Sequence, residues 1–166
     1  MATAEQNLSD HGIIEFKGLK NLRIGIVWAD WNFEITNNLK NGALDFLKYC
    51  NVPESNIFTY KVPGSFELPL AAQWLIEKHD VDGVICVGSV IKGETDHFHY
   101  VCSAVSQGIK DVSLKTGKPV IFGVLTDNIK QQALDRSGGK HGNKGIEAAI
   151  TAIQINNTPA TASCRA

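Results

Sequence analysis

A lysine, two acidic residues, a threonine and a histidine lie close together in KGETDH, residues 92–97. This segment stands directly after an apolar run and before a helical pattern that begins at Phe98. The free N–H groups and positive dipole end of a helix start attract anions, and Lys92 adds a cation. The alternative is an ordinary helix start capped by Thr95 or Asp96. The spacing G-x-x-x-x-G-K-[ST] is absent, so a Walker-type phosphate loop is not expected.

His97 is the residue of this segment best suited to proton transfer, because imidazole titrates near neutral pH. A histidine at a helix start is also common as plain polar surface, and the sequence alone leaves that alternative open. His97 and His99 form an H-x-H pair, yet residues two apart on a helix point in different directions. No third ligand has suitable spacing, so we expect no metal site.

Polar and aromatic residues also follow the other apolar runs of the chain. Trp31 and Asn32 come after the first run, PGSFE (63–67) after the second, and residues 126–128 after the fourth. Ligands of open α/β sheets bind beyond the carboxyl ends of the strands, so these residues are expected to converge. Trp31 would stack on a heterocycle or merely pack on the sheet's end. Glu67 would accept hydroxyl hydrogen bonds or merely favour a helix start.

Continuous apolar runs predict the strands that position these residues. The runs lie at 22–29, 57–63, 81–91 and 119–126, and each is typical of a strand buried on both faces. The segment GIIEFKGLK, residues 12–20, is expected to add an N-terminal edge strand, in its own sheet or in a neighbour's.

Apolar residues at helical spacing lie between these runs and predict the covering helices. Ser65 is a plausible cap of the second helix. The order of elements predicts an α/β fold, a doubly wound four-stranded parallel sheet flanked by helices in a flavodoxin-like three-layer sandwich. The two clearest stripes are Ile35, Leu39, Ala43, Phe46 and Cys50, then Phe98, Val101, Val105, Ile109 and Val112.

Composition favours one domain with a small-molecule partner. The 166 residues are 43% hydrophobic with a formal net charge of −1, so we expect one core and neither nucleic-acid nor membrane binding. Four scattered cysteines without C-x-x-C predict a reduced, cytoplasmic protein, and the N-terminus has no signal-peptide pattern. We expect one domain over 13–156, with flexible segments at 1–12 and 157–166.

The glycine-rich segment SGGKHGNKG, residues 137–145, separates two helical stretches. Arg136 and Glu147 flank it and are interpreted as a surface ion pair or as part of a site. The glycines would permit a kink or a close approach to another chain. So many polar groups at the rim of one small domain suggest a site completed by a neighbouring subunit.

Four ordered segments resemble the 6,7-dimethyl-8-ribityllumazine synthase family: VPGSFELPLAA, GSVIKGETDHFHYV, PVIFGVLT and QALDRSGGKHGNKGIEAA. The resemblance covers about residues 13–155. It implies an enzyme of riboflavin biosynthesis that condenses 5-amino-6-ribitylaminouracil with 3,4-dihydroxy-2-butanone 4-phosphate and releases phosphate and water. It also implies that neither a metal nor an organic cofactor takes part.

The resemblance assigns roles to residues of this chain. His97 would transfer protons, and Trp31 would stack on the pyrimidine. Arg136 would face phosphate, with Glu147 orienting it, and Arg136 and Lys144 would belong with His97 to the catalytic set. The ribityl chain and ring would be held by Asn32, Ser65, Phe66, Glu67, Val90, Ile91 and Lys92; the phosphate by Gly93, Glu94 and Thr95; and the adjacent subunit would supply Phe122, Arg136 and Lys144.

The resemblance also implies an assembly. Family members form pentamers, and many build hollow icosahedral shells of twelve pentamers; the short segment 137–145 favours such a sixty-subunit shell here. Riboflavin synthase is an expected partner. A catalytically silent flavin- or lumazine-binding paralogue and a purely structural shell protein are the alternatives. Two positions depart from the common family pattern: His99 replaces an acidic residue, and Trp31 replaces phenylalanine and predicts binding of riboflavin itself.

Overall fold

The computed structural model describes residues 19–157, which form a four-stranded parallel sheet, five α-helices and a small two-stranded hairpin. The strands are β1 (Ile24–Ala29), β2 (Ile57–Val62), β3 (Gly83–Ile91) and β4 (Val120–Asp127), in the sheet order β2-β1-β3-β4. The helices are α1 (Phe33–Tyr49), α2 (Leu68–His79), α3 (His97–Thr116), α4 (Lys130–Arg136) and α5 (Lys144–Asn157). The predicted α/β fold class is confirmed.

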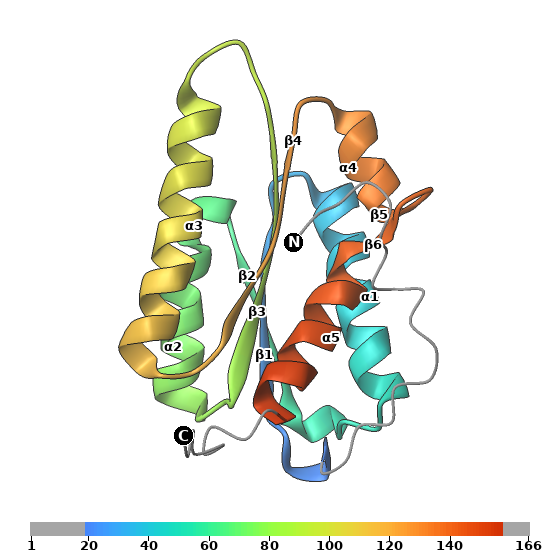
Figure 1. The fold of residues 1–166 in the computed structure, drawn as a ribbon, viewed down its shortest axis with the longest axis vertical. Helices are drawn as coiled ribbons and strands as arrows, with labels where there is room; N and C mark the ends of the chain where they lie inside the picture. Colours follow the sequence, from blue (N-terminus) through green and yellow to red (C-terminus); the bar gives the residue numbers. More distant parts are fainter. Residues whose placement is uncertain (1–18, 158–166) are drawn as a thin grey trace, which may run out of the picture.

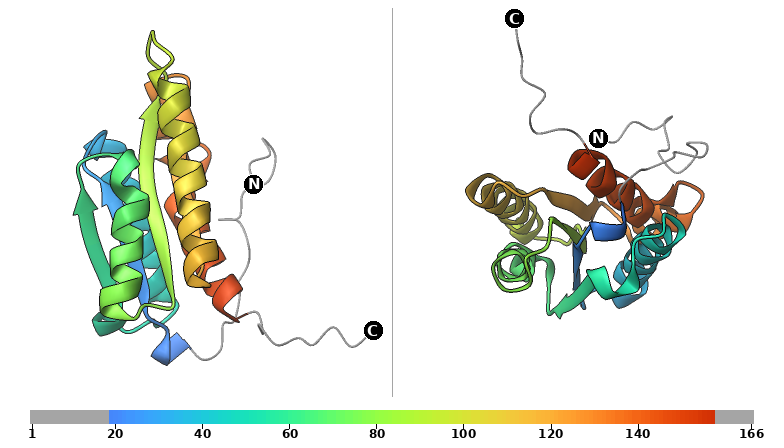
Figure 2. Two further views of the ribbon diagram at one scale, coloured as in Figure 1. Left: turned by 90° about the vertical axis from the view of Figure 1, so that its left-hand side faces the viewer. Right: turned by 90° about the horizontal axis from the view of Figure 1, so that it is seen from below.

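The helices cover both faces of the sheet. Helices α2 and α3 lie on one face, and α1, α4 and α5 lie on the other (Figure 1). The view along the sheet shows the resulting three layers (Figure 2). Strand β3 is central and almost wholly buried, as expected of a strand covered by helices on both sides.

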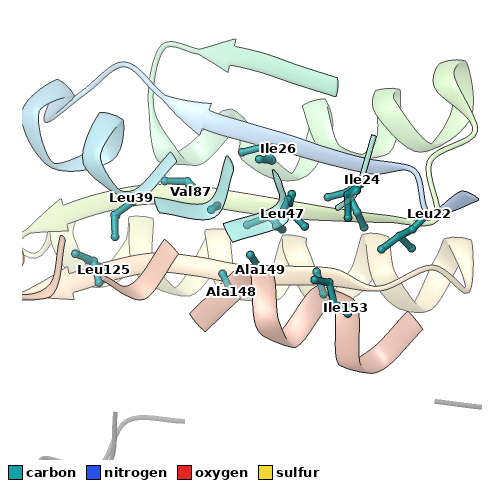
Figure 3. Packing of buried hydrophobic residues seen from close by; sticks show 14 of the residues in the cluster. Leu22, Ile24, Ile26, Leu39, Leu47, Val87, Leu125, Ala148, Ala149 and Ile153 are labelled. Carbon is teal, nitrogen blue, oxygen red and sulfur yellow. The ribbon is translucent and has the colours of Figure 1, made fainter. Parts of the chain in front are cut away.

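Two hydrophobic clusters fill the spaces between the layers. In the cluster beneath α1 and α5, Ile24, Ile26 and Val87 of the sheet meet Leu39 and Ile153 of the helices (Figure 3). Helices α1 and α5 also approach each other closely at Gly145. A Cβ atom there would overlap the main-chain carbonyl of Leu39, so this position requires glycine.

The predicted helical stripes are confirmed in part, because Phe98 and Val101 at the start of α3 are only half-buried and the stripe of α1 is shifted. Val105, Ile109 and Val112 are buried as expected. In α1 the prediction was wrong at Phe46, which is only half-buried, because Leu47 takes the core position. Tertiary packing chooses between adjacent apolar residues that periodicity alone does not separate.

Two local predictions were also wrong. Ser65 does not cap α2; it begins a 3-10 turn, η4 (Ser65–Glu67), and α2 starts after it. Segment 137–145 is not a plain kink, because β5 (Ser137–Gly139) and β6 (Gly142–Asn143) form a small antiparallel hairpin. Two further 3-10 turns are η2 (Leu19–Asn21) and η3 (Glu54–Asn56).

The expected edge strand at 12–20 lies outside the described residues, apart from Leu19 and Lys20 in η2. The expected flexible segments lie outside them too, except Asn157, the last residue of α5. Within residues 19–157, none of the helices combines the length and hydropathy that a bilayer span requires.

Main-chain hydrogen bonds tie the carboxyl ends of the strands together. Asp30 N–H donates to the Val62 carbonyl at 2.7 Å, and Trp31 N–H donates to the Pro63 carbonyl at 3.0 Å. Lys92 N–H donates to the Asp127 carbonyl at 2.9 Å. The loops after β1, β2, β3 and β4 are therefore held side by side at one edge of the sheet (Figure 1).

Candidate active site

A pocket of about 360 Å³ opens at the carboxyl ends of β1 and β3. It is lined from β3, from the loops after β1, β2 and β3, and from the start of α3. The predicted convergence therefore holds for the ends of β1, β2 and β3, whereas residues 126–128 at the end of β4 line a separate pocket. The lining residues are Trp31, Asn32, Gly64, Ser65, Phe66, Ser89, Val90, Ile91, Gly93, Thr95, His97, Phe98 and Val101.

Aromatic side chains border this pocket without being buried in the core. Trp31 is 73% exposed and Phe66 is 62% exposed. The packing alternative for Trp31 is therefore wrong in the isolated chain, because a ring that served the core would be covered. Two flat, exposed rings beside a pocket suit the stacking of a planar heterocycle.

Asn32 is held in a left-handed backbone conformation, with φ 59° and ψ 43°. Asparagine tolerates this conformation better than most residues. Its amide Nδ2 donates to the Ser89 carbonyl at 3.0 Å, which links the start of α1 to β3. The amide oxygen of Asn32 remains as an acceptor at the pocket.

Glu67 lies beside the pocket but does not line it. Its Oε2 accepts a hydrogen bond from Gly64 N–H at 3.0 Å, which closes the η4 turn. The helix-start interpretation of Glu67 thus holds in part, because one carboxylate oxygen stabilises a turn. Ser65 next to it is buried and does line the pocket.

His97 is the first residue of α3, and its side chain is exposed and lines the pocket. The predicted caps of α3 are weak or absent: Thr95 Oγ accepts from His97 N–H at 3.4 Å, and Asp96 makes no side-chain cap. Within the described chain, the N–H groups of residues 93–96 make no hydrogen bond. They remain available to an anion.

The charged residues of KGETDH are not all at the pocket. Gly93 and Thr95 line it, and a Cβ at Gly93 would meet no atom within 4 Å, so the backbone there is open to approach. Lys92 and Glu94 are exposed and do not line the pocket in the single chain. The structure thus brings His97 together with the backbone of this segment, whereas Lys92 and Glu94 stay outside the pocket lining.

A second, larger pocket of about 770 Å³ runs along β4 between α4 and α5. It has no lining residue in common with the first. Strand β4 is an edge strand, and Phe122 on it is 43% exposed. The lining comprises residues 120–128, Gln132, Arg136, Lys144, Glu147, Ala148 and Thr151.

Two cation–carboxylate pairs line this second pocket. Lys144 Nζ donates to Glu147 Oε1 at 2.6 Å, and both side chains are mostly buried. Arg136 Nη1 lies 3.9 Å from Asp127 Oδ1 and donates to the Gln132 carbonyl at 2.9 Å. The predicted ion pair between Arg136 and Glu147 is therefore wrong in the single chain, because Lys144 on the same helix is the nearer cation.

The sequence interpretation missed several pocket residues. Phe98 and Val101 were placed in the core stripe, but both also line the first pocket. Ser89 was read only as part of an apolar strand, and its buried Oγ has no hydrogen-bond partner among the described residues. Asp127 was named only as a strand-end residue. A polar side chain inside an apolar strand end was the available signal in both cases.

No group of three or more histidine, cysteine, aspartate or glutamate side chains with metal-binding geometry occurs in the described residues. Three cysteines are described, and all three are free thiols. Burial raises the pKa of the Cys86 thiol, which lies wholly inside the sheet, so this thiol stays protonated and inert.

Fold and pockets together define an α/β protein of the flavodoxin-like kind, with ligand sites at the strand ends and along an edge strand. The sequence profile of 6,7-dimethyl-8-ribityllumazine synthase matches residues 21–160. The chain therefore belongs to the 6,7-dimethyl-8-ribityllumazine synthase family, a family of enzymes.

Individual relatives agree with this assignment. A 6,7-dimethyl-8-ribityllumazine synthase of Cytophaga hutchinsonii is 55% identical over 93% of this chain and 97% of the relative. The corresponding protein of Flavobacterium johnsoniae is 52% identical over 93% of this chain and 82% of the relative. The corresponding protein of Porphyromonas gingivalis is 50% identical over 93% of this chain and 96% of the relative.

Proposed function

We propose that this chain condenses 5-amino-6-(D-ribitylamino)uracil with 3,4-dihydroxy-2-butanone 4-phosphate to 6,7-dimethyl-8-ribityllumazine, with release of phosphate and water. One observation links this reaction to specific residues of the chain. The pocket at the strand ends unites exposed aromatic rings, open N–H groups and a histidine. A planar substrate, an anion and a proton-transfer step each find a matching group there.

The pyrimidine and its ribityl chain occupy the part of the pocket next to Trp31. The indole ring stacks on the heterocycle, and the Asn32 amide oxygen accepts a hydrogen bond from it or from the chain. Ser65, Phe66 and Glu67 hold the ribityl hydroxyls; the Glu67 oxygen that does not close the η4 turn is the acceptor. Val90 and Ile91 border the other edge of the ring, and Lys92 follows them just outside the pocket lining of the single chain.

The phosphate of the second substrate binds at the uncapped start of α3. The N–H groups of Gly93, Glu94 and Thr95 and the Thr95 hydroxyl donate to its oxygens, and the helix dipole adds a favourable field. This position places the substrate's ketone carbon near His97, which lines the same pocket.

The chemistry needs positioning and proton transfer. The 5-amino nitrogen adds to the ketone carbon, and water leaves as the imine forms. A carbon–oxygen bond to phosphate then breaks while the adjacent carbon loses a proton, and the resulting enol becomes a ketone. The ribitylamino nitrogen adds to this carbonyl carbon, and a second water leaves as the ring closes. His97 accepts and returns the protons of these steps.

A second copy of the chain supplies the rest of the site. Phe122, Arg136, Lys144 and Glu147 line the separate pocket on edge strand β4, so one chain carries two half-sites. Docking the β4 half-site of one subunit against the strand-end half-site of its neighbour completes both. Repetition of this head-to-tail contact closes a ring, and we propose a pentamer and a shell of twelve pentamers.

The same proposal places the enzyme in the cytoplasm, with riboflavin synthase as the partner that consumes its product. Sedimentation velocity checks the assembly. A sixty-subunit particle supports the shell, whereas a free pentamer across buffers and pH values would contradict it.

Turnover tests the function directly. The purified protein is mixed with both substrates in a chelator-containing buffer, and lumazine fluorescence is followed together with phosphate release. Equal production of the two products establishes the activity, and His97→Ala is expected to slow it about 10²–10⁴-fold. His79→Ala, which changes the exposed histidine that ends α2, is the matched control.

Two outcomes would contradict the proposal. Tight binding of the ribitylaminouracil without turnover would identify a silent binding paralogue. Unchanged turnover in His97→Ala would remove His97 from the mechanism.

A further inference from the structure

The two ion pairs of the β4 pocket differ in how fully they neutralise their cations. Lys144 and Glu147 share a 2.6 Å hydrogen bond on one helix, so each largely cancels the other. Arg136 and Asp127 come from different elements and approach only to 3.9 Å, the outer limit of an ion pair. Arg136 is therefore the cation of this pocket with charge available for an added anion.

Asp127 is fixed in place and incompletely compensated. It is the last residue of β4 and only 7% exposed, and its carbonyl accepts from Lys92 N–H at 2.9 Å. The carboxylate Oδ2 is buried without a hydrogen-bond partner in the described chain. Such an atom is costly unless something nearby offsets its charge. Among the described residues, Arg136 is the one cation within ion-pair distance of the Asp127 carboxylate, and it approaches the other oxygen, Oδ1.

The guanidinium of Arg136 has donors to spare. Nη1 donates to the Gln132 carbonyl, and neither Nε nor Nη2 has a partner among residues 19–157. The side chain is 36% exposed and lines the pocket. An anion that binds these free donors must share the positive charge with Asp127, which cannot move away.

We propose that Asp127 is a positioning residue that acts through Arg136: its fixed carboxylate lowers the affinity of the guanidinium for phosphate and so promotes release of the phosphate product. The proposal rests on the phosphate role of Arg136 proposed above. This role would explain why a buried carboxylate lies beside Arg136, where its negative charge opposes anion binding.

The pH dependence follows from the groups around Asp127. Burial raises the pKa of Asp127, and the Arg136 charge on α4 partly opposes this shift. From α5, Lys144 and Glu147 face the same pocket as a mutually neutralised pair. As the pH falls through the pKa of Asp127, its carboxylate is neutralised. Anion affinity at Arg136 therefore rises toward acid pH.

Calorimetric titration of the full-length assembly with inorganic phosphate tests the proposal. Asp127→Asn removes the charge with little change of shape, and we expect about three- to tenfold tighter phosphate binding at neutral pH. The KM for the phosphate-bearing substrate falls, and product inhibition by phosphate strengthens. Sulfate, whose charge stays constant as the pH falls, binds the unmodified protein more tightly toward acid pH, and this rise is smaller in Asp127→Asn.

Two controls separate the possible failures. Asp80→Asn makes the same charge change at the far end of the sheet, where φ is 47° and asparagine is well tolerated, and it leaves phosphate binding unchanged. If Arg136→Ala binds phosphate as the unmodified protein does, the phosphate role of Arg136 and this proposal both fall. If Arg136→Ala weakens binding but Asp127→Asn does not tighten it, the proposal for Asp127 alone is wrong.

Discussion

Replacement of Gly88 by alanine tests how the sheet shapes the strand-end pocket. A Cβ atom at Gly88 would lie 2.5 Å from Ser65 Oγ, 3.3 Å from Ser65 Cβ and 3.1 Å from Leu68 Cδ1. Contacts under 3.0 Å essentially never occur for real Cβ atoms, so Ser65 must retreat. Ser65 is buried and begins the η4 turn, so the turn moves with it.

We expect Gly88→Ala to destabilise the protein by about 1–3 kcal/mol, the usual cost of overpacking. For a chain of this size each kcal/mol lowers Tm by about 2–4 °C. The KM for the ribitylaminouracil should rise more than kcat falls, because in the proposed site η4 holds the ribityl chain and not the reacting atoms. Thermal unfolding at fixed protein concentration and steady-state kinetics measure both quantities.

Ser65→Ala provides the matched partner. It removes the 2.5 Å contact and leaves the 3.3 Å contact, so the double variant should regain more than half of the lost stability. The KM should not recover, because the Ser65 hydroxyl, which is proposed to bind the ribityl chain, is also gone. Equal Tm values for Gly88→Ala and the unmodified protein, or no recovery in the double variant, would show that close packing of Gly88 against Ser65 does not shape the pocket.

Three further substitutions test separate parts of the account. Trp31→Ala should weaken riboflavin and lumazine binding about tenfold through lost stacking, as measured by fluorescence titration. Gly145→Ala forces a Cβ atom into the Leu39 carbonyl and should lower stability by about 3 kcal/mol or more in thermal unfolding. Lys144→Ala leaves the mostly buried Glu147 carboxylate without its cation and should cost about 2–3 kcal/mol in the same assay.

Each of these substitutions has a control in the chain. Trp74→Ala changes a partly exposed tryptophan on α2 and should leave ligand binding intact, whereas equal losses would contradict stacking at Trp31. Gly93→Ala meets no atom within 4 Å and should be stable. The pair Lys144→Ala with Glu147→Ala should be more stable than Lys144→Ala alone; the opposite order would argue against the ion pair.

The sequence predicted the features of the fold that depend on repeating patterns. Continuous apolar runs of strand length predicted the four strands of the parallel sheet. The spacing of Val105, Ile109 and Val112 predicted the buried face of α3. Their order implied a parallel sheet, whose carboxyl ends must meet. For that reason Trp31 and His97, far apart in sequence, were correctly expected at one pocket.

The features that the sequence did not predict depend on which of two similar residues, close together in the chain, takes a given position in the fold. Phe46 and Leu47 differ by one position, and only the orientation of α1 against α5 decides which is buried. Likewise, the sequence offers both Arg136 and Lys144 as cations for Glu147, and the hairpin at 137–143 determines which of them lies nearer. The loose contact of Arg136 with Asp127 depends on where α4 lies relative to the end of β4, which periodicity does not specify.

In the proposed assembly, each active site combines His97 of one subunit with Arg136 of its neighbour. Turnover by assemblies co-expressed from His97→Ala and Arg136→Ala chains tests this sharing, because each variant is expected to be nearly inactive alone. Random mixing in a head-to-tail ring should restore full function at about a quarter of the sites. If the mixed assemblies were no more active than either variant alone, the site would not be shared between subunits, and the claim would be wrong.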